Sequence, residues 1–148
     1  MSSPYAEPAP PSGAPGGKTS FMNLDSNLGA MLCYILNFVC CLGLVLSIVF
    51  AITEKENRFV KFHAVQSLFL TGLQIVVGII LGILGLVLSL VLRQIDMEFL
   101  AWILILGLRF LVFGVFLVLW IIAGVKAYGG QWYKLPIVGE FAWKTVNN

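Results

Sequence analysis

Residues 62–92 read FHAVQSLFLTGLQIVVGIILGILGLVLSLVL and contain no Asp, Glu, Lys or Arg. A transmembrane helix needs roughly 20 apolar residues, because each residue adds ~1.5 Å against a hydrocarbon core ~30 Å thick. The stretch is too short for two spans and a turn, and longer than one upright span requires. It therefore predicts one long, tilted helix whose first two turns lie in the membrane interface.

Two further apolar blocks flank this stretch, at about 29–52 and 99–125. Of the 148 residues, 59% are hydrophobic and 11% are charged. A soluble domain carries roughly 25% charged residues, which this chain lacks. We therefore predict an all-α fold, a polytopic membrane helical bundle with three transmembrane helices and interfacial helical segments. The net charge of +2 gives no reason to expect nucleic acid binding.

The chain is expected to form one membrane domain preceded by a tail. Residues 1–22 hold five of the six prolines with repeated Gly and Ser, so they predict disorder. They do not resemble a secretory signal. Residues 23–148 form the predicted helical membrane domain, which ends in an interfacial C-terminal segment, 126–148.

Basic residues in the flanks predict the orientation. With three spans, the 53–61 loop and the C-terminal tail share one side, which carries six Lys and Arg residues, while Lys18 and Arg93 lie on the other. We expect a multi-pass protein of the bacterial cytoplasmic (inner) membrane, with its N-terminus outside and its C-terminus cytoplasmic.

Small and polar residues recur every three or four positions along the second helix and share one face. Small residues let membrane helices approach closely, so this is a predicted helix-packing face. It packs either against the other two spans or as a homo-oligomer seam or polar groove. The residues are Ser67, Thr71, Gln74, Gly78, Gly82, Gly85 and Ser89.

Arg109 is the one formal charge well inside an apolar span. Burying Arg in a bilayer costs at least about 2.5–3.5 kcal/mol, so it is expected to face protein, water or a lipid headgroup. Asn37 in the first span lies at a similar expected depth and is its predicted partner. A structural or lipid-anchoring role and a transport or cofactor role both remain open.

The residues that catalysis would need are scarce. No Asp or Glu lies inside a predicted span, and His63 is the only histidine. Proton relays, His-cluster metal sites and nucleophilic triads each need more such groups. We expect no enzyme activity, no cofactor and no metal.

Both flanks of the apolar blocks are expected to anchor the protein at the interface. Thr53-x-x-Glu56 predicts a helix-capping box. The C-terminal flank predicts a helix end at Gly129-Gly130 and an amphipathic segment after Pro136. Tyr128, Trp132 and Tyr133 form a predicted aromatic belt, and Ile137, Phe141 and Trp143 form the apolar side of that segment. The expected partner of the acidic Glu54 is Lys134 or Lys144.

The two flanks also carry a resemblance. The stretch EKENRFVKFHAVQS, residues 54–67, resembles the signature of a bacterial membrane family of unknown function, and KAY…KLPIVG, residues 126–139, resembles its C-terminal signature. That family is similar to the twenty-kilodalton component of the chloroplast Tic translocon, which implies a helical membrane domain. The signature residues are Glu54, Lys55, Glu56, Asn57, Arg58, Phe59, His63, Gln66 and Ser67, then Lys126, Tyr128, Lys134, Pro136 and Gly139.

Three functions fit these features. The first is a non-catalytic scaffold or accessory subunit in the lipid bilayer, packing against other membrane protein subunits or as a homo-oligomer. The second is a translocation or channel component like the Tic translocon. The third is a lipid- or pigment-contacting accessory protein that shields or positions a cofactor held by a partner.

Overall fold

A computed structural model describes residues 16–38 and 42–147. Within these ranges the chain is helical. The elements in order are α1 (Ser26–Ile35), the 3-10 turn η1 (Leu36–Phe38), α2 (Leu42–Thr53), α3 (Arg58–Arg93), α4 (Glu98–Tyr128) and α5 (Val138–Asn147).

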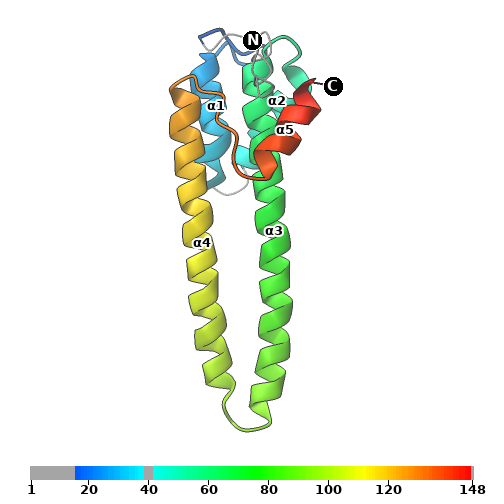
Figure 1. The fold of residues 1–148 in the computed structure, drawn as a ribbon, viewed down its shortest axis with the longest axis vertical. Coiled ribbons are helices and arrows are strands. Elements are labelled where there is room, and N and C mark those ends of the chain that lie inside the picture. Colours follow the sequence, from blue (N-terminus) through cyan, green and yellow to red (C-terminus); the bar gives the residue numbers. More distant parts are fainter. Residues whose placement is uncertain (1–15, 39–41, 148) are drawn as a thin grey trace, which may run out of the picture.

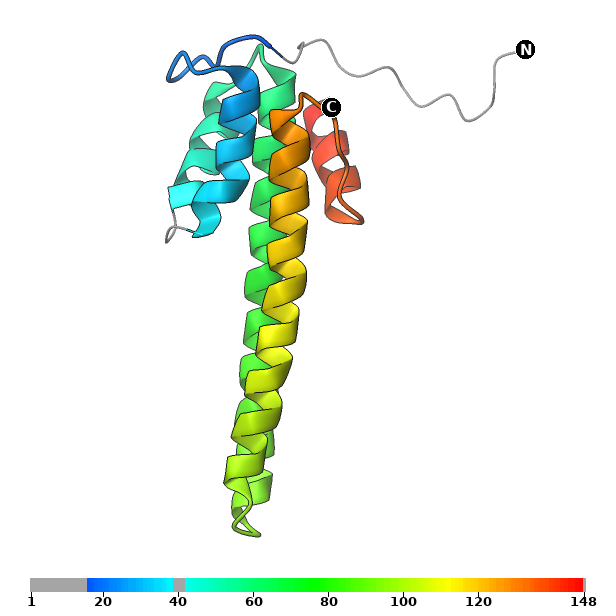
Figure 2. The same ribbon diagram turned by 90° about the vertical axis from the view of Figure 1, so that its left-hand side faces the viewer.

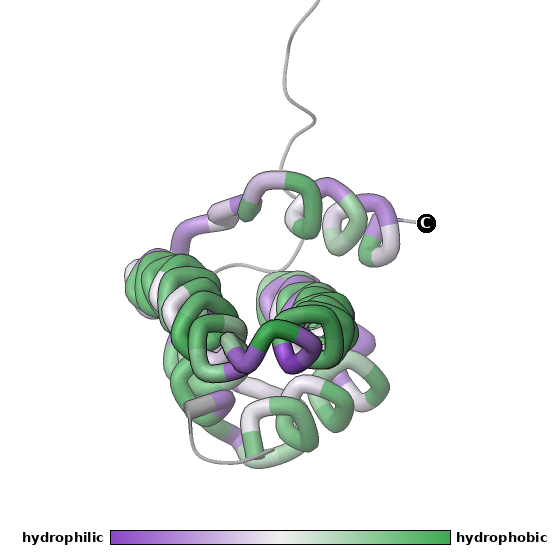
Figure 3. Tube along the Cα trace, turned by 90° about the horizontal axis from the view of Figure 1, so that it is seen from below, coloured by the Kyte–Doolittle hydropathy of each residue, from purple (hydrophilic) through white to green (hydrophobic). Residues whose placement is uncertain are grey.

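The two long helices form an antiparallel hairpin that runs the length of the molecule (Figure 1). At ~1.5 Å per residue, the 36 residues of α3 extend about 54 Å and the 31 residues of α4 about 46 Å. Both are long and apolar enough to cross a membrane. Viewed from the tip of the hairpin, hydrophobic residues dominate both helices (Figure 3). The predicted spans at 62–92 and 99–125 therefore each correspond to one continuous helix.

The prediction of a third span was wrong. The first apolar block forms two short helices, α1 and α2, of 10 and 12 residues. They fold back on each other beside one half of the long hairpin (Figures 1 and 2). Helices of this length extend about 15–18 Å, roughly half of a hydrocarbon core ~30 Å thick.

Asn37 and Gly43 account for this reversal. The Asn37 side chain donates a 2.7 Å hydrogen bond to the Cys33 carbonyl, which pairs a backbone group near the end of α1. A Cβ built on Gly43 would lie 2.4 Å from the Asn37 backbone nitrogen, so only glycine lets α2 begin this close to η1. Hydrophobicity alone did not distinguish this hairpin from one span of the same length.

Helix α5 packs beside α3 at the same end of the molecule as α1 and α2 (Figure 1). This end, which we call the cap, comprises residues 16–38, 42–67 and 120–147. Trp143 of α5 is buried against Phe62 and Trp132, whereas Ile137 and Phe141 are exposed. In the amphipathic C-terminal segment, Trp143 thus packs on protein, whereas Ile137 and Phe141 face outward.

The folded-back hairpin also changes the expected topology. The described N-terminal residues contact the 54–57 loop, and α5 lies at the same end. The N-terminal segment and the C-terminal helix therefore lie on one side of the long hairpin, not on opposite sides. The reason is that α1 and α2 fold back on each other, so together they do not carry the chain from one end of the long hairpin to the other.

Two local predictions also differ from the structure. Asn57, not Thr53, caps α3, because its side chain accepts a hydrogen bond from the Val60 amide, while the Thr53 hydroxyl bonds the Val49 carbonyl. Of the predicted tail, residues 1–15 lie outside the described residues. Residues 16–22 belong to a hydrogen-bonded loop in which Thr19 is buried.

Candidate functional site

Gln66 is the centre of a buried polar network in the cap. Its side chain is fully buried, and its amide nitrogen donates to the Tyr34 hydroxyl (2.9 Å) and to the Tyr133 carbonyl (3.1 Å). Its amide oxygen accepts from the Leu135 backbone N–H at 3.1 Å. One side chain thus bonds α1 and the segment between α4 and α5 to α3.

His63, one turn earlier on α3, completes this connection. Its Nε2 lies 3.1 Å from the Gln131 carbonyl, which only accepts, so Nε2 carries the proton. Its Nδ1 lies 3.0 Å from the Tyr34 hydroxyl, which already accepts from Gln66. The Tyr34 hydroxyl therefore donates to Nδ1, and a neutral imidazole satisfies every group in the network.

A second set of polar contacts holds the α1–α2 hairpin to α3. The Cys33 carbonyl accepts a 2.7 Å hydrogen bond from Ser67 as well as the bond from Asn37. The hydroxyl oxygens of Ser47 and Ser67 lie 3.2 Å apart, which joins the middle of α2 to the third turn of α3. Sequence reasoning placed Ser67 on the packing face but did not find its partners, because they are 20 to 34 residues away.

The partner of Glu54 is Ser20, not Lys134 or Lys144. The Glu54 carboxylate is fully buried and accepts from the Ser20 backbone N–H at 2.6 Å and the Ser20 hydroxyl at 3.0 Å. Lys134 instead lies 3.8 Å from Glu140 and above the Trp143 ring. The Asn57 amide also donates to Ser26, at the start of α1.

The remaining signature residues differ in their surroundings. Phe59 is buried and packs edge-to-face on His63, with ring centroids 4.7 Å apart. A Cβ on Gly139 would lie 2.7 Å from the Lys134 Cα, so α5 turns back closely on the preceding loop. The exposed members are Lys55, Glu56, Arg58, Tyr128 and Pro136, and Lys126 is half-buried.

The predicted packing face of α3 turns towards α4 along a line of three cavities, which we call the α3–α4 groove. The cavities have volumes of about 280 to 340 Å³ and adjoin through shared lining residues. Their size is at the lower end for small-molecule sites. The α3 residues in their lining include Thr71, Gln74, Gly78, Gly82, Gly85 and Ser89.

Contact across the groove is uneven. A Cβ on Gly85 would lie 3.2 Å from Ile105 of α4, which is a close approach of the two helices. A Cβ on Gly78 would meet nothing within 4 Å. The two helices therefore approach closely at Gly85, while there is open space beside Gly78.

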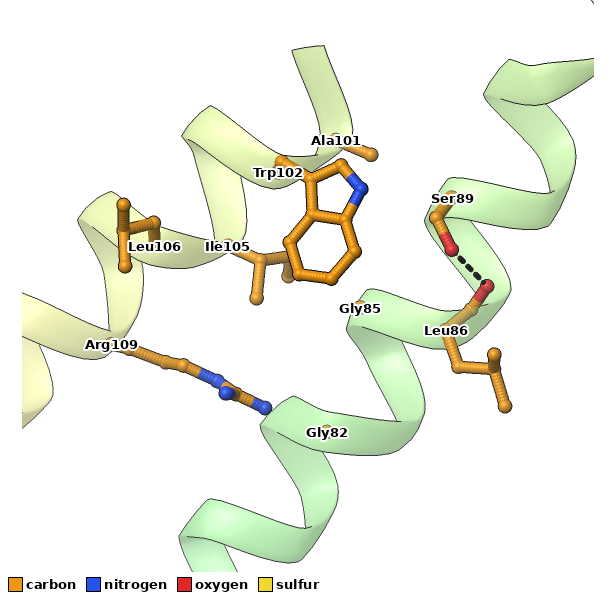
Figure 4. Close-up of a pocket in the computed structure, with 9 residues that line it drawn as sticks. All are labelled: Gly82, Gly85, Leu86, Ser89, Ala101, Trp102, Ile105, Leu106 and Arg109. Carbon is orange, nitrogen blue, oxygen red and sulfur yellow. Dashed lines mark hydrogen bonds between the residues drawn. The ribbon is translucent and has the colours of Figure 1, made fainter. Parts of the chain in front are cut away.

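Arg109 extends from α4 across the groove towards Gly82 (Figure 4). Its guanidinium would lie 3.5 Å from a Cβ at that position. The expected partner Asn37 lines a different cavity and bonds Cys33, so the predicted Arg109–Asn37 pairing was wrong. That pairing assumed that the first block spans the membrane, whereas the block turns back at this point.

The chemistry available in the groove is limited to one cation and several neutral polar groups. In the described ranges, no acidic residue is among those that line it. Across the same ranges, no group of three or more His, Cys, Asp or Glu could hold a metal ion.

The family model described as the magnetosome magnetite crystal formation protein family matches residues 25–142. The chain belongs to this family. The matched region begins at Asp25, the N-cap residue of α1, and ends within α5. It therefore contains the polar network around Gln66 and the whole α3–α4 groove.

Relatives in two archaea describe the family further. A UPF0132 membrane protein of Methanocaldococcus jannaschii is 37% identical over 126 residues, which cover 85% of this chain and 92% of that protein. A second from the same organism is 29% identical, covering 82% and 70%, and one from Archaeoglobus fulgidus is 32% identical, covering 80% and 93%.

These names describe membrane proteins of unknown function, so the expected family type is confirmed. These relatives are archaeal, so the description of the family as bacterial was too narrow. The comparisons do not show the likeness to the Tic translocon. No solved structure matches the chain significantly.

Proposed function

We propose that this family member is a non-catalytic membrane scaffold, which packs against helices of other membrane proteins or of further copies through the α3–α4 groove. The observation that carries the proposal is the open space at Gly78, where a Cβ would meet no atom of the chain within 4 Å. In lipid, helix association depends on close packing at small residues, because lipid tails are as apolar as leucine.

Arg109 supports the same proposal. It lies about 16 Å from the start of α4, near the middle of a hydrocarbon core ~30 Å thick. A charge at that depth is expected to face protein or water. A helix seated in the groove would cover the guanidinium and exclude lipid from it.

Gly78→Leu tests this function. A Cβ at this position meets no atom within 4 Å, and the rest of the leucine side chain occupies space in the groove, so we expect the fold to be retained and association to be lost. Gly107→Leu is the matched control, because a Cβ there also meets nothing within 4 Å and Gly107 does not line the groove.

The measurement is gentle solubilisation, native-gel sizing and mass spectrometry of co-purifying proteins. We expect the wild-type and Gly107→Leu complexes to match, and the Gly78→Leu complex to be smaller. An unchanged complex in Gly78→Leu refutes a scaffold that works through the groove.

A translocation role is the second candidate, because Asn37, Thr71, Gln74 and Arg109 line successive cavities between the helices. A water-filled path would make Gln74 and Arg109 reachable from solution. Cysteines at these two positions, in a chain whose native cysteines are replaced, should then react with a membrane-impermeant thiol reagent. Absence of reaction counts against a path.

The cap end is proposed to face the cytoplasm of a prokaryotic cell. Seven of the nine basic residues lie there, and Arg93 is the one at the opposite tip. Cytoplasmic flanks carry the excess of Lys and Arg. The basic residues of the cap are Lys18, Lys55, Arg58, Lys61, Lys126, Lys134 and Lys144.

A further inference from the structure

The number of helices differs between the two halves of the long α3–α4 hairpin. α3 and α4 are long enough to pass through both leaflets, whereas α1 and α2 extend only about 15–18 Å each. Figure 2 shows these short helices beside the cap half of the long hairpin, with α3 and α4 extending beyond them.

Side-chain contacts fix this placement. The bond between Ser47 and Ser67 holds α2 at the third turn of α3, and Tyr34 of α1 packs on Trp120 near the end of α4. In the opposite half, Gly85 of α3 faces Ile105 of α4 directly. The described residues therefore place α1 and α2 beside α3 and α4 in the cap half, where α5 also packs on α3, and leave α3 and α4 without these neighbours in the other half.

The outer face of α2 belongs in lipid. Val45, Ile48 and Ile52 recur at spacings of three and four, so they share one face, and their exposed fractions are 55%, 42% and 69%. Residues 26–53 also contain no formal charge. Leaving this face in water would forfeit about 25 cal/mol for each Å² of apolar surface.

We infer that the fold is a leaflet-asymmetric wedge, so that the protein concentrates in curved membrane whose convex leaflet contains the cap. A helix with its side chains is ~10 Å across, so α1 to α4 together occupy about twice the lateral area of α3 and α4 alone, and α5 adds to the cap side. Curvature that expands the cap leaflet accommodates the extra area. The inference rests on helix lengths and does not depend on a partner in the α3–α4 groove.

Membrane tethers test the wedge with the unmodified sequence. The chain, carrying a dye on a C-terminal tag, is reconstituted into giant vesicles of phosphatidylcholine and phosphatidylglycerol, and a narrow tether is pulled outward. The ratio of protein to lipid fluorescence in the tether is divided by the same ratio in the vesicle. A membrane-impermeant quencher separates molecules with the cap outside from those with the cap inside.

Molecules with the cap outside are expected to give a sorting ratio above one that rises as the tether is thinned. Molecules with the cap inside are expected to give a ratio below one. The two orientations share every residue and differ only in the sign of curvature that they meet. Equal ratios for both, or the reverse order, overturn the inference.

A triple variant and its matched control test whether the α1–α2 hairpin causes the curvature sorting. Val45→Ser, Ile48→Ser and Ile52→Ser together weaken insertion of α2 into the leaflet, and these side chains are too exposed to support the core. We expect the sorting ratio to fall towards one, with far-UV circular dichroism unchanged. An unaltered ratio overturns the role of the α1–α2 hairpin.

The matched control carries the same three polar changes in the half with two helices. Val87→Ser, Leu90→Ser and Val91→Ser replace exposed residues of α3 that lie close together on the helix surface. This control is expected to keep the sorting ratio of the original chain. A fall equal to that of the α2 variant would mean that hydrophobicity, not shape, sets the sorting, and would overturn the inference.

Discussion

Replacing Gln66 with leucine removes three hydrogen bonds from the centre of the cap while nearly preserving side-chain volume. The Leu135 N–H loses this side-chain partner in a buried setting and the Tyr133 carbonyl loses it in a part-buried one, whereas the Tyr34 hydroxyl keeps His63 as its acceptor. An unsatisfied buried polar group costs about 1–3 kcal/mol. Two such groups predict a loss of about 2–6 kcal/mol in the free energy of unfolding.

Denaturant titration of the purified chain in detergent micelles, followed by circular dichroism, measures this loss. Limited proteolysis gives a second readout, because Gln66 holds the segment that leads into α5, so cleavage should increase first between α4 and α5. The control is Gln94→Leu, at an exposed site in the tip of the hairpin, with an expected change within about 0.5 kcal/mol. If Gln66→Leu is as stable as this control, the network does not hold the cap together.

Four further outcomes are expected. Asn57→Ala should destabilise the fold by about 0.5–2 kcal/mol in the same titration, because it removes the side-chain hydrogen bond at the N-terminus of α3. Thr53→Ala should cost less. Gly139→Ala should cost about 1–3 kcal/mol, because its Cβ would strike the Lys134 backbone. Gly107→Ala, in open space, should be neutral or stabilising, since alanine favours a helix by about 1 kcal/mol. Reporters fused at either terminus should both be active in the cytoplasm. Activity of only one would contradict the placement of both termini on the same side of the membrane.

The long hairpin could be predicted from sequence because its cause is local. Residues 62–92 and 99–125 are apolar over more than the thickness of a membrane, and such a stretch forms a helix in lipid whatever it packs against. The end of α4 at Gly129 follows from local chemistry in the same way. The position of the small residues on one face of α3 is likewise a consequence of helical period.

Part of the cap site was visible in the sequence and part was not. The two signature segments were singled out, but their direct bonds, from His63 to Gln131 and from Gln66 to Leu135, join residues 68 and 69 positions apart. No local pattern encodes a pairing at that distance. The amide side chain of Gln66 within an apolar helix was the one available signal of this site, because a buried amide needs hydrogen-bond partners.

Sequence alone therefore determined that this chain is a helical membrane protein in which residues 62–92 and 99–125 form long apolar helices, since hydrophobicity and helical period act over neighbouring residues. Only the tertiary structure decided the fate of the first apolar block. Its length and composition suit a span, yet the contact of Gly43 with the Asn37 backbone and the bonds from Ser67 to Cys33 and Ser47 favour a hairpin. These contacts exist only when α1, α2 and α3 are together, so both the topology and the asymmetry between the leaflets depend on packing.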